Sequence, residues 1–166
     1  MTKGKLDLRE RRDQVYPAAL AYLAHREYAE SELRQRLLRR GAEAEAVDEA
    51  IDRLRQGNWL SEERFAYSRV RQRRDITGRG RAAIRSELRS LGVEDSLVEA
   101  ALEGEYDRQR EAEAVARLAQ KALRGLEDIP DPQLKHKKLQ AVQRRLLARG
   151  FSPALVQEAT GEYSED

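Results

Sequence analysis

Three stretches of sequence superpose with a glycine at the same place: ELRQRLLRRGAEAEAVDEAI (32–51), AIRSELRSLGVEDSLVEAAL (83–102) and AVQRRLLARGFSPALVQEAT (141–160). The shared glycines are Gly41, Gly92 and Gly150. Each has a leucine four residues before it, an aliphatic residue eight before it and a valine six after it. Because spacings of four and eight residues place side chains on one helix face, each stretch predicts a helix, a glycine turn and a second helix.

The distance between the glycines sets the size of the repeat. Gly41, Gly92 and Gly150 are 51 and 58 residues apart, which gives each unit room for about three helices. Glycine suits the turn because it adopts a left-handed backbone without a Cβ clash. We therefore predict an all-α fold of three tandem three-helix repeats, similar to helix-turn-helix modules. The predicted ranges are 14–57, 58–104 and 105–163, after an N-terminal tail at 1–13.

Capping residues support this reading. Ser61, followed by Glu62 and Glu63, predicts the start of a helix over about 62–74. Asp131-Pro132 and Ser152-Pro153 open two helices in the third repeat. The capping signal is weaker in the first repeat, since Ala29 occupies the expected cap position.

Composition excludes several classes of protein. The 166 residues are 40% hydrophobic and 37% charged, with only nine aromatic residues and no alternating β-branched runs. The absence of cysteine excludes disulfides, thiolate zinc sites and cysteine nucleophiles. No apolar run has the length of a signal peptide or a membrane span. We expect a soluble, cytoplasmic monomer.

Charge is distributed in blocks, although the net charge is only +2. Residues 64–92 hold nine arginines and two acids, whereas 93–114 hold eight acids and two arginines. Residues 115–150 hold nine bases and three acids, and 151–166 hold four acids and no base. Such blocks predict surfaces of opposed charge.

Two basic clusters are the candidate binding residues. The first surrounds a Gly-x-Gly loop and comprises Arg69, Arg71, Arg73, Arg74, Arg79, Arg81, Arg85 and Arg89. The second comprises Lys135, Lys137, Lys138, Arg144 and Arg145. Arginine forks suit phosphates or the carboxylates of a partner. The alternative for both clusters is a solvated face that only aids solubility.

No catalytic, metal or cofactor constellation is found. His25 and His136 lack the spacing of a helical metal pair, and Gly78-Arg79-Gly80 lacks the remainder of a phosphate loop. Acid pairs such as Glu62-Glu63 fit helix capping better than acid–base chemistry. We expect neither an enzyme nor a bound cofactor. The aromatic residues Trp59, Phe65 and Tyr67 are predicted to anchor one module on the next rather than to stack on bases.

The stretch GNWLSEERFA at 57–66 is followed by Arg73, Gly80, Ile84, Glu87-Leu88 and Gly92-Val93. Upstream of it are Ala21-Tyr22-Leu23, Arg26 and Glu32-Leu33, and downstream is the stretch from Leu146 to Phe151. In this order, from about residue 15 to residue 160, the sequence resembles the RecX family of recombinase regulators, and 57–66 is the most specific part. The chain departs from the family pattern at Ala29, where a serine cap is usual, and at Ser61-Glu62-Glu63.

The resemblance implies an elongated, curved array that binds the RecA recombinase and its filament on DNA. Family members lower strand exchange and the linked ATP hydrolysis in recombination, DNA repair and the SOS response, and some bind DNA directly. No family catalytic residue carries over. Two other hypotheses remain open from the residues: a stand-alone DNA-binding protein acting through phosphate contacts, and a helical scaffold with an unrelated partner.

Overall fold

The computed structural model describes residues 12–161 and 163, and every regular element in that part of the chain is an α-helix. The prediction of an all-α fold is confirmed. The predicted N-terminal tail, residues 1–13, lies almost wholly outside the described residues. The helices are α2 (Val15–Leu23), α3 (Glu30–Arg39), α4 (Ala44–Gln56), α5 (Glu62–Asp75), α6 (Arg81–Ser90), α7 (Asp95–Glu105), α8 (Arg108–Leu123), α9 (Pro132–Ala148) and α10 (Pro153–Gly161).

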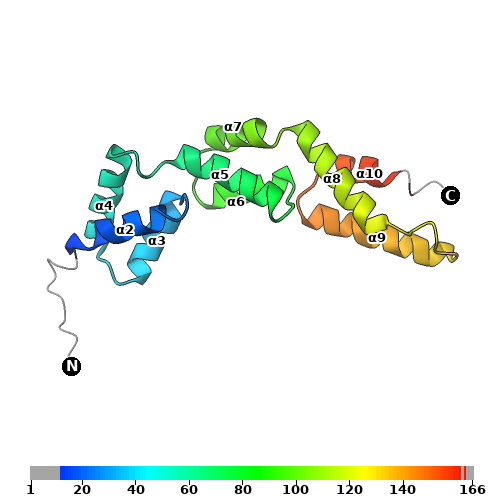
Figure 1. Ribbon diagram of the computed structural model, residues 1–166, viewed down its shortest axis with the longest axis horizontal. Helices are drawn as coiled ribbons and strands as arrows, with labels where there is room; N and C mark the ends of the chain where they lie inside the picture. Colours follow the sequence, from blue (N-terminus) through cyan, green and yellow to red (C-terminus); the bar gives the residue numbers. More distant parts are fainter. Residues whose placement is uncertain (1–11, 162, 164–166) are drawn as a thin grey trace, which may run out of the picture.

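The helices form three groups along a bent rod (Figure 1). We call them module 1 (α2–α4), module 2 (α5–α7) and module 3 (α8–α10). Each has its own cluster of buried apolar residues, centred on Leu33 and Ile51, on Phe65 and Leu102, and on Val115 and Leu146. Because each of these cores is small, we expect contacts between neighbouring modules to add to their stability.

The same turn follows α3, α6 and α9. Gly41, Gly92 and Gly150 have φ of 85°, 84° and 89°, which is the left-handed region predicted for them. In each turn the glycine N–H donates to the carbonyl three residues back, and the next N–H donates to the carbonyl five residues back. This pair of bonds is the Schellman motif, and it ends the helix while turning the chain into the next one.

The predicted caps open their helices. The Ser61 hydroxyl accepts a hydrogen bond from the Arg64 N–H at the start of α5. The Asp131 carboxylate caps α9 with Pro132 in the first turn, and Ser152 accepts from the Leu155 N–H at the start of α10. Because these caps satisfy N–H groups that lack helical partners, they fix where each helix begins.

Ala29 has a structural role at the junction of modules 1 and 2. It precedes α3 without a side-chain cap, but it is fully buried in the apolar cluster of module 2. Beside it, the Ser31 hydroxyl donates to the Leu91 carbonyl of module 2 over 2.5 Å. A small apolar side chain at position 29 therefore replaces a cap with a contact between modules.

Modules 2 and 3 meet through their backbones. The Gly80 N–H donates to the Arg149 carbonyl over 2.9 Å, and the Ala82 N–H donates to the Gly150 carbonyl over 3.2 Å. A Cβ on Gly80 would overlap the backbone of Gly150, and a Cβ on Gly150 would overlap Ala83. Both glycines are thus required by a close approach between modules.

Equivalent helices of the three modules follow the same edges of the rod. In Figure 1, α3, α6 and α9 lie toward the inner edge of the arc, and α7 lies on the outer edge. The inner helices are those that precede the glycine turns, so the repeat in sequence becomes a repeat along the surface. A binding surface on this edge would therefore combine residues of all three modules.

Candidate functional site

Three arginines of the predicted patch form a ladder of ion pairs between α6 and α7. Arg81, Arg85 and Arg89 stand eleven, seven and three residues before Gly92, and an acid stands at each of the same distances after it. The glycine turn brings these positions opposite one another. The nitrogen–oxygen distances are 3.3 Å for Arg81–Glu103, 2.5 Å for Arg85–Glu99 and 2.7 Å for Arg89–Asp95.

The middle rung of this ladder is the best defined. Arg85 donates to both carboxylate oxygens of Glu99, at 2.5 and 2.8 Å. This hydrogen bonding and the nearby positive charges lower the pKa of the Glu99 carboxyl, while the bond to Glu99 raises the pKa of Arg85. Such a bidentate pair leaves the guanidinium with few donors for another ligand.

Arg69, which the sequence placed in the binding patch, is instead a buried structural residue. Its side chain is only 9% exposed and contacts Glu32 of module 1 and Glu87 of module 2, each at 3.1 Å. Arg73 also donates to Glu87, with a shortest distance of 2.7 Å. These ion pairs hold α3, α5 and α6 together, so Arg69 is closed to a partner and Arg73, with its side chain 26% exposed, is mostly covered.

The other arginines of this patch lie around the end of α5. Arg71 pairs with Glu105 at 2.6 Å, and Arg74 pairs with Asp75 at 2.6 Å while donating to the Glu105 carbonyl. Arg79 is exposed in the following loop, and its guanidinium has no partner among the described residues. The side chains of Arg71 and Arg89 are 51% and 50% exposed.

The acids of residues 93–114 therefore fold back on the arginines of residues 64–92. The prediction that these blocks form surfaces of opposed charge is wrong for α6 and α7. The prediction overlooked that a hairpin of two helices places opposite charges in register. Within the predicted patch, Arg71, Arg79 and Arg89 are the exposed residues.

The second predicted cluster differs from the first in whether its basic side chains form ion pairs. Lys137, Arg144 and Arg145 are exposed on α9, and Lys138 is half-buried. None of these four has a carboxylate partner within residues 12–161 and 163, and α9 itself contains no acid. Lys135 is half-buried on the same helix and has interactions of its own. The positive charge of α9 is thus directed at solvent.

A third basic cluster, which the sequence analysis did not identify, lies on module 1. The Arg26 guanidinium stands 3.6 Å from the ring centre of Tyr28, and Arg36 stands 4.7 Å from that of Tyr22. Arg40 donates to the Tyr22 hydroxyl over 3.0 Å. The hydrogen bonds from Arg40 and then Arg36 lower the pKa of the Tyr22 hydroxyl. The i, i+4 spacing of Arg36 and Arg40 could have indicated the shared face.

A buried carboxylate closes the junction of modules 2 and 3. Glu111 of α8 is 6% exposed and accepts the Arg81 N–H over 2.7 Å. It caps α6, whose preceding residue Gly80 has no side chain to do so. Burial raises the pKa of the Glu111 carboxyl, and the bond from the Arg81 N–H opposes this shift. This acid therefore has a structural role.

The aromatic residues that were predicted as anchors have different positions in the structure. Phe65 is buried in the module 2 core and Tyr67 packs beside Gly104, whereas Trp59 is 57% exposed, so its prediction as an anchor is wrong.

The described residues contain no group of three metal-ligating side chains. No helix in this part of the chain has the length and apolarity needed to cross a membrane.

Comparisons with known proteins agree with this architecture. The sequence model for "RecX, first three-helix domain" matches residues 16–54, and that for "RecX, second three-helix domain" matches residues 61–102. The Regulatory protein RecX of Syntrophotalea carbinolica is 31% identical over 87% of this chain and 93% of its own length. That of Geobacillus kaustophilus is 31% identical over 83% of this chain. The chain spans about half, 49%, of the Geobacillus relative.

Solved structures share the fold. The crystal structure of RecX from Lactobacillus salivarius superposes with a TM-score of 0.75, covering 93% of this chain and 97% of that one at 23% identity. A second crystal structure of a regulatory protein RecX gives a TM-score of 0.77 at 24% identity, covering 97% of this chain and 82% of that one. The sequence matches and the shared helical repeat lead to one conclusion. The chain belongs to the RecX family of regulatory proteins.

Proposed function

We propose that this protein binds the RecA recombinase and its filament on DNA and inhibits strand exchange and DNA-dependent ATP hydrolysis. It acts as a monomer in the cytoplasm, in recombination, DNA repair and the SOS response, and it has no catalysis of its own. The observation that carries this proposal is membership of a family of regulatory proteins combined with an arc of three linked modules. An extended arc suits a polymer better than it suits a small ligand.

The junctions between modules give this proposal a physical basis. The contacts of Ala29 and Arg69 join module 1 to module 2, and those of Gly80 and Gly150 join module 2 to module 3. A surface that is already ordered loses little conformational entropy when it binds. If the arc binds one state of a filament more tightly than another, it shifts the population toward that state and inhibits without chemistry.

The exposed arginines of module 2 are the proposed protein contacts. Arg71, Arg79 and Arg89 keep exposed guanidinium surface, whereas Arg69 and Arg73 are enclosed by acids. Arg74 and Arg81 are also mostly covered, with side chains 24% and 15% exposed. Substitutions that test binding should therefore be placed at the first three positions.

The test is a titration of the purified protein into RecA that is hydrolysing ATP on single-stranded DNA. We expect turnover to fall at amounts of protein below one per RecA subunit. The triple variant R71E/R79E/R89E should inhibit at least about tenfold more weakly with an unchanged helical circular-dichroism spectrum. Unaltered ATP turnover in the presence of excess wild-type protein contradicts the proposed function.

A charge-swapped variant is the matched control. R89D/D95R exchanges the two members of one rung and so preserves the ion pair. If R89E acts only by breaking the ladder, the swap restores inhibition. If the Arg89 charge meets the filament, the swap leaves inhibition weak.

Direct DNA binding is the second candidate function, and the cations of α9 favour it. Exposed Lys137, Arg144 and Arg145 lack carboxylate partners among the described residues, so they can neutralise phosphates without breaking an internal pair. Binding through phosphates weakens with added salt, and the log–log slope reports how many are neutralised. An affinity that does not change with salt eliminates this candidate.

A further inference from the structure

The tyrosine–arginine cluster of module 1 has features of a binding surface. Arg36 and Arg40 are exposed on one face of α3, and Tyr22 of α2 lies half-buried between them. Arg39 lies on the same face and is also exposed. The tyrosine ring and hydroxyl hold the first two guanidinium groups in place before any ligand arrives. Preorganised arginines bind anions at a lower entropic cost.

Three arginines of this cluster have no ion-pair partner among the described residues. Arg36, Arg39 and Arg40 have no carboxylate partner in the part of the chain that the structure describes; Arg39 bonds only Gln35. Arg26, which stacks on Tyr28, pairs with Glu32 at 3.3 Å. The contrast with α6 is direct, because every arginine of that helix pairs with an acid of α7.

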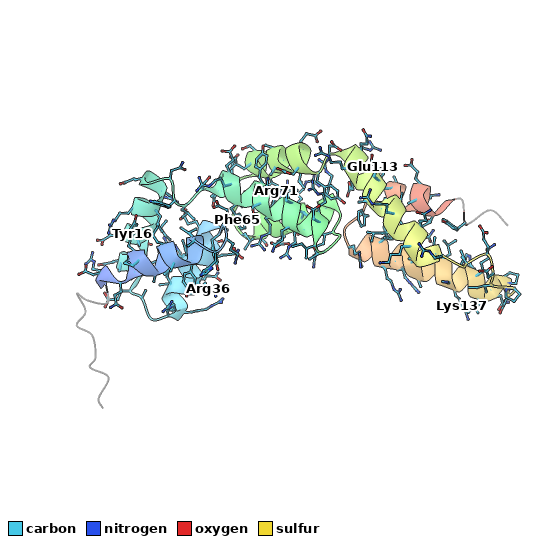
Figure 2. The ribbon with its side chains drawn as sticks, viewed as in Figure 1. Tyr16, Arg36, Phe65, Arg71, Glu113 and Lys137 are labelled. Atoms are coloured by element: carbon cyan, nitrogen blue, oxygen red, sulfur yellow. The ribbon has the colours of Figure 1, made fainter. Side chains whose placement is uncertain are left out.

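The cluster lies at the opposite end of the arc from the cations of α9. Figure 2 shows Arg36 and Lys137 toward the inner edge, one on the first module and one on the last. Module 2 separates them, and its α6 arginines are paired internally. The inner edge therefore has two cationic ends and a neutralised centre.

We propose that the α3 face formed by Arg36, Arg39 and Arg40 beside Tyr22 is a second binding site for single-stranded DNA. One strand is then held at both ends of the arc, by this face and by the α9 cations. The proposal rests on the direct DNA contact proposed above and deepens it. The arginines of the ladder between α6 and α7 do not contribute to this binding.

The chemistry of the cluster favours a single strand over other polyanions. A guanidinium held over a tyrosine ring keeps its outer face free, and unpaired bases stack on such planes while the phosphates accept hydrogen bonds. An acidic protein surface offers carboxylates but no bases to stack. The aromatic support of the arginines distinguishes this site from the α9 face, where Lys137, Arg144 and Arg145 make no cation–π contact with an aromatic ring of the described residues.

A site divided between two ends predicts a dependence on strand length. A short oligonucleotide can occupy only one end, whereas a strand long enough to span module 2 occupies both. The second contact is then intramolecular, and the affinity rises without any new chemistry. The affinity should therefore increase abruptly at one length rather than gradually.

The experiment measures binding of fluorescently labelled deoxythymidine oligonucleotides of about 6 to about 40 nucleotides by anisotropy. For the wild-type protein we expect a rise in affinity of about tenfold or more between the shortest and longest strands. R36Q/R40Q should abolish this rise and leave the weak binding of short strands. The matched control R81Q/R85Q removes the same charge from the equivalent helix α6, where both arginines are paired with acids, and it should retain the rise.

The possible outcomes separate the two proposals. If the wild-type protein binds no oligonucleotide, direct DNA contact fails and this inference fails with it. If the protein binds but R36Q/R40Q keeps the length dependence, only the inference is overturned. If R36Q/R40Q binds DNA normally and instead loses inhibition of RecA, the cluster recognises a protein surface, which also overturns the inference. Circular dichroism of each variant shows whether module 1 remains folded.

Discussion

Modules 2 and 3 are built on the same repeat, yet they use their positive charge in opposite ways. In module 2 the residues three, seven and eleven places on either side of Gly92 form three ion pairs. Around Gly150 the positions seven places away are Gln143 and Gln157, and Gln143 bonds Thr160 instead. Module 1 is intermediate, with one such rung between Arg34 and Asp48 around Gly41.

The difference shows that the charge of a segment does not determine whether its cations are available. Residues 64–92 and 115–150 both carry a large excess of bases. The first block is followed across a glycine turn by an acidic helix, and the second is followed by α10, which holds one described acid, Glu158. Pairing across the hairpin decides which cations face solvent.

The strongest test of the repeat compares the turns of these two modules. Gly150→Ala should destabilise the protein by about 4 kcal/mol, because it adds a left-handed alanine and a clash with Ala83. Gly92 has nearly the same φ and open space around it, so Gly92→Ala should cost only about 1 kcal/mol. Urea denaturation gives both values. Equal costs would show that module 3 does not press against module 2 as described.

Removing Arg69 should have the next largest effect. Arg69→Ala removes the buried cation that joins Glu32 to Glu87 and should cost about 3 kcal/mol. Arg71 on the same helix is half-exposed, so Arg71→Ala should cost less than about 1 kcal/mol. The two variants are compared by their free energies of unfolding. Similar losses would contradict a structural role that is particular to Arg69.

A single ion pair of the ladder should contribute much less to the free energy of unfolding. A double-mutant cycle with R85A and E99A should give a coupling energy of about 0.5–1 kcal/mol, as expected for a pair that is partly exposed to solvent. The same cycle at Gln143 and Gln157 is the control in module 3. Coupling of equal size there would remove the distinction between the two hairpins.

The smallest effects concern pH and have opposite signs for two carboxyls. Arg85 lowers the pKa of the Glu99 carboxyl in the folded state. The contribution of Glu99 to the free energy of unfolding is therefore present above the ordinary pKa of 4.5 and is lost as the pH falls below that value. The folded pKa of Glu111 is raised by burial, so the wild-type protein gains stability relative to E111Q as the pH falls toward 4.5. Difference curves of unfolding free energy for E99Q and E111Q should slope in opposite directions. Parallel curves would contradict these environments.

Much of the fold could be predicted because local rules determine it. The glycine turns, the Ser61, Asp131 and Ser152 caps and the apolar spacing each depend on neighbours within a few residues. The turn after α4 has the same pair of backbone hydrogen bonds, but its left-handed residue is Asn58, with φ of 56°, and not a glycine. Asparagine tolerates that region, so the same turn forms with a different residue.

The candidate binding residues were harder to predict because their exposure depends on contacts between helices. Arg69 could not be recognised as buried without knowing that Glu32, thirty-seven residues earlier, lies beside it. The cation–tyrosine contacts of Arg36 likewise join α3 to Tyr22 of the preceding helix and to Tyr28 of the preceding loop. The ladder, however, was visible in the sequence, since its acids and bases are placed symmetrically about Gly92.

The most direct test of this division of charge is the salt dependence of single-stranded DNA binding by two matched triple variants. K137Q/R144Q/R145Q removes three charges from α9, and R81Q/R85Q/R89Q removes three from α6. The first should reduce the magnitude of the log–log slope by about 2, because about 0.7 ions are released per phosphate neutralised. The second should leave the slope at its wild-type value. A loss of slope in the α6 variant equal to that in the α9 variant would contradict the account.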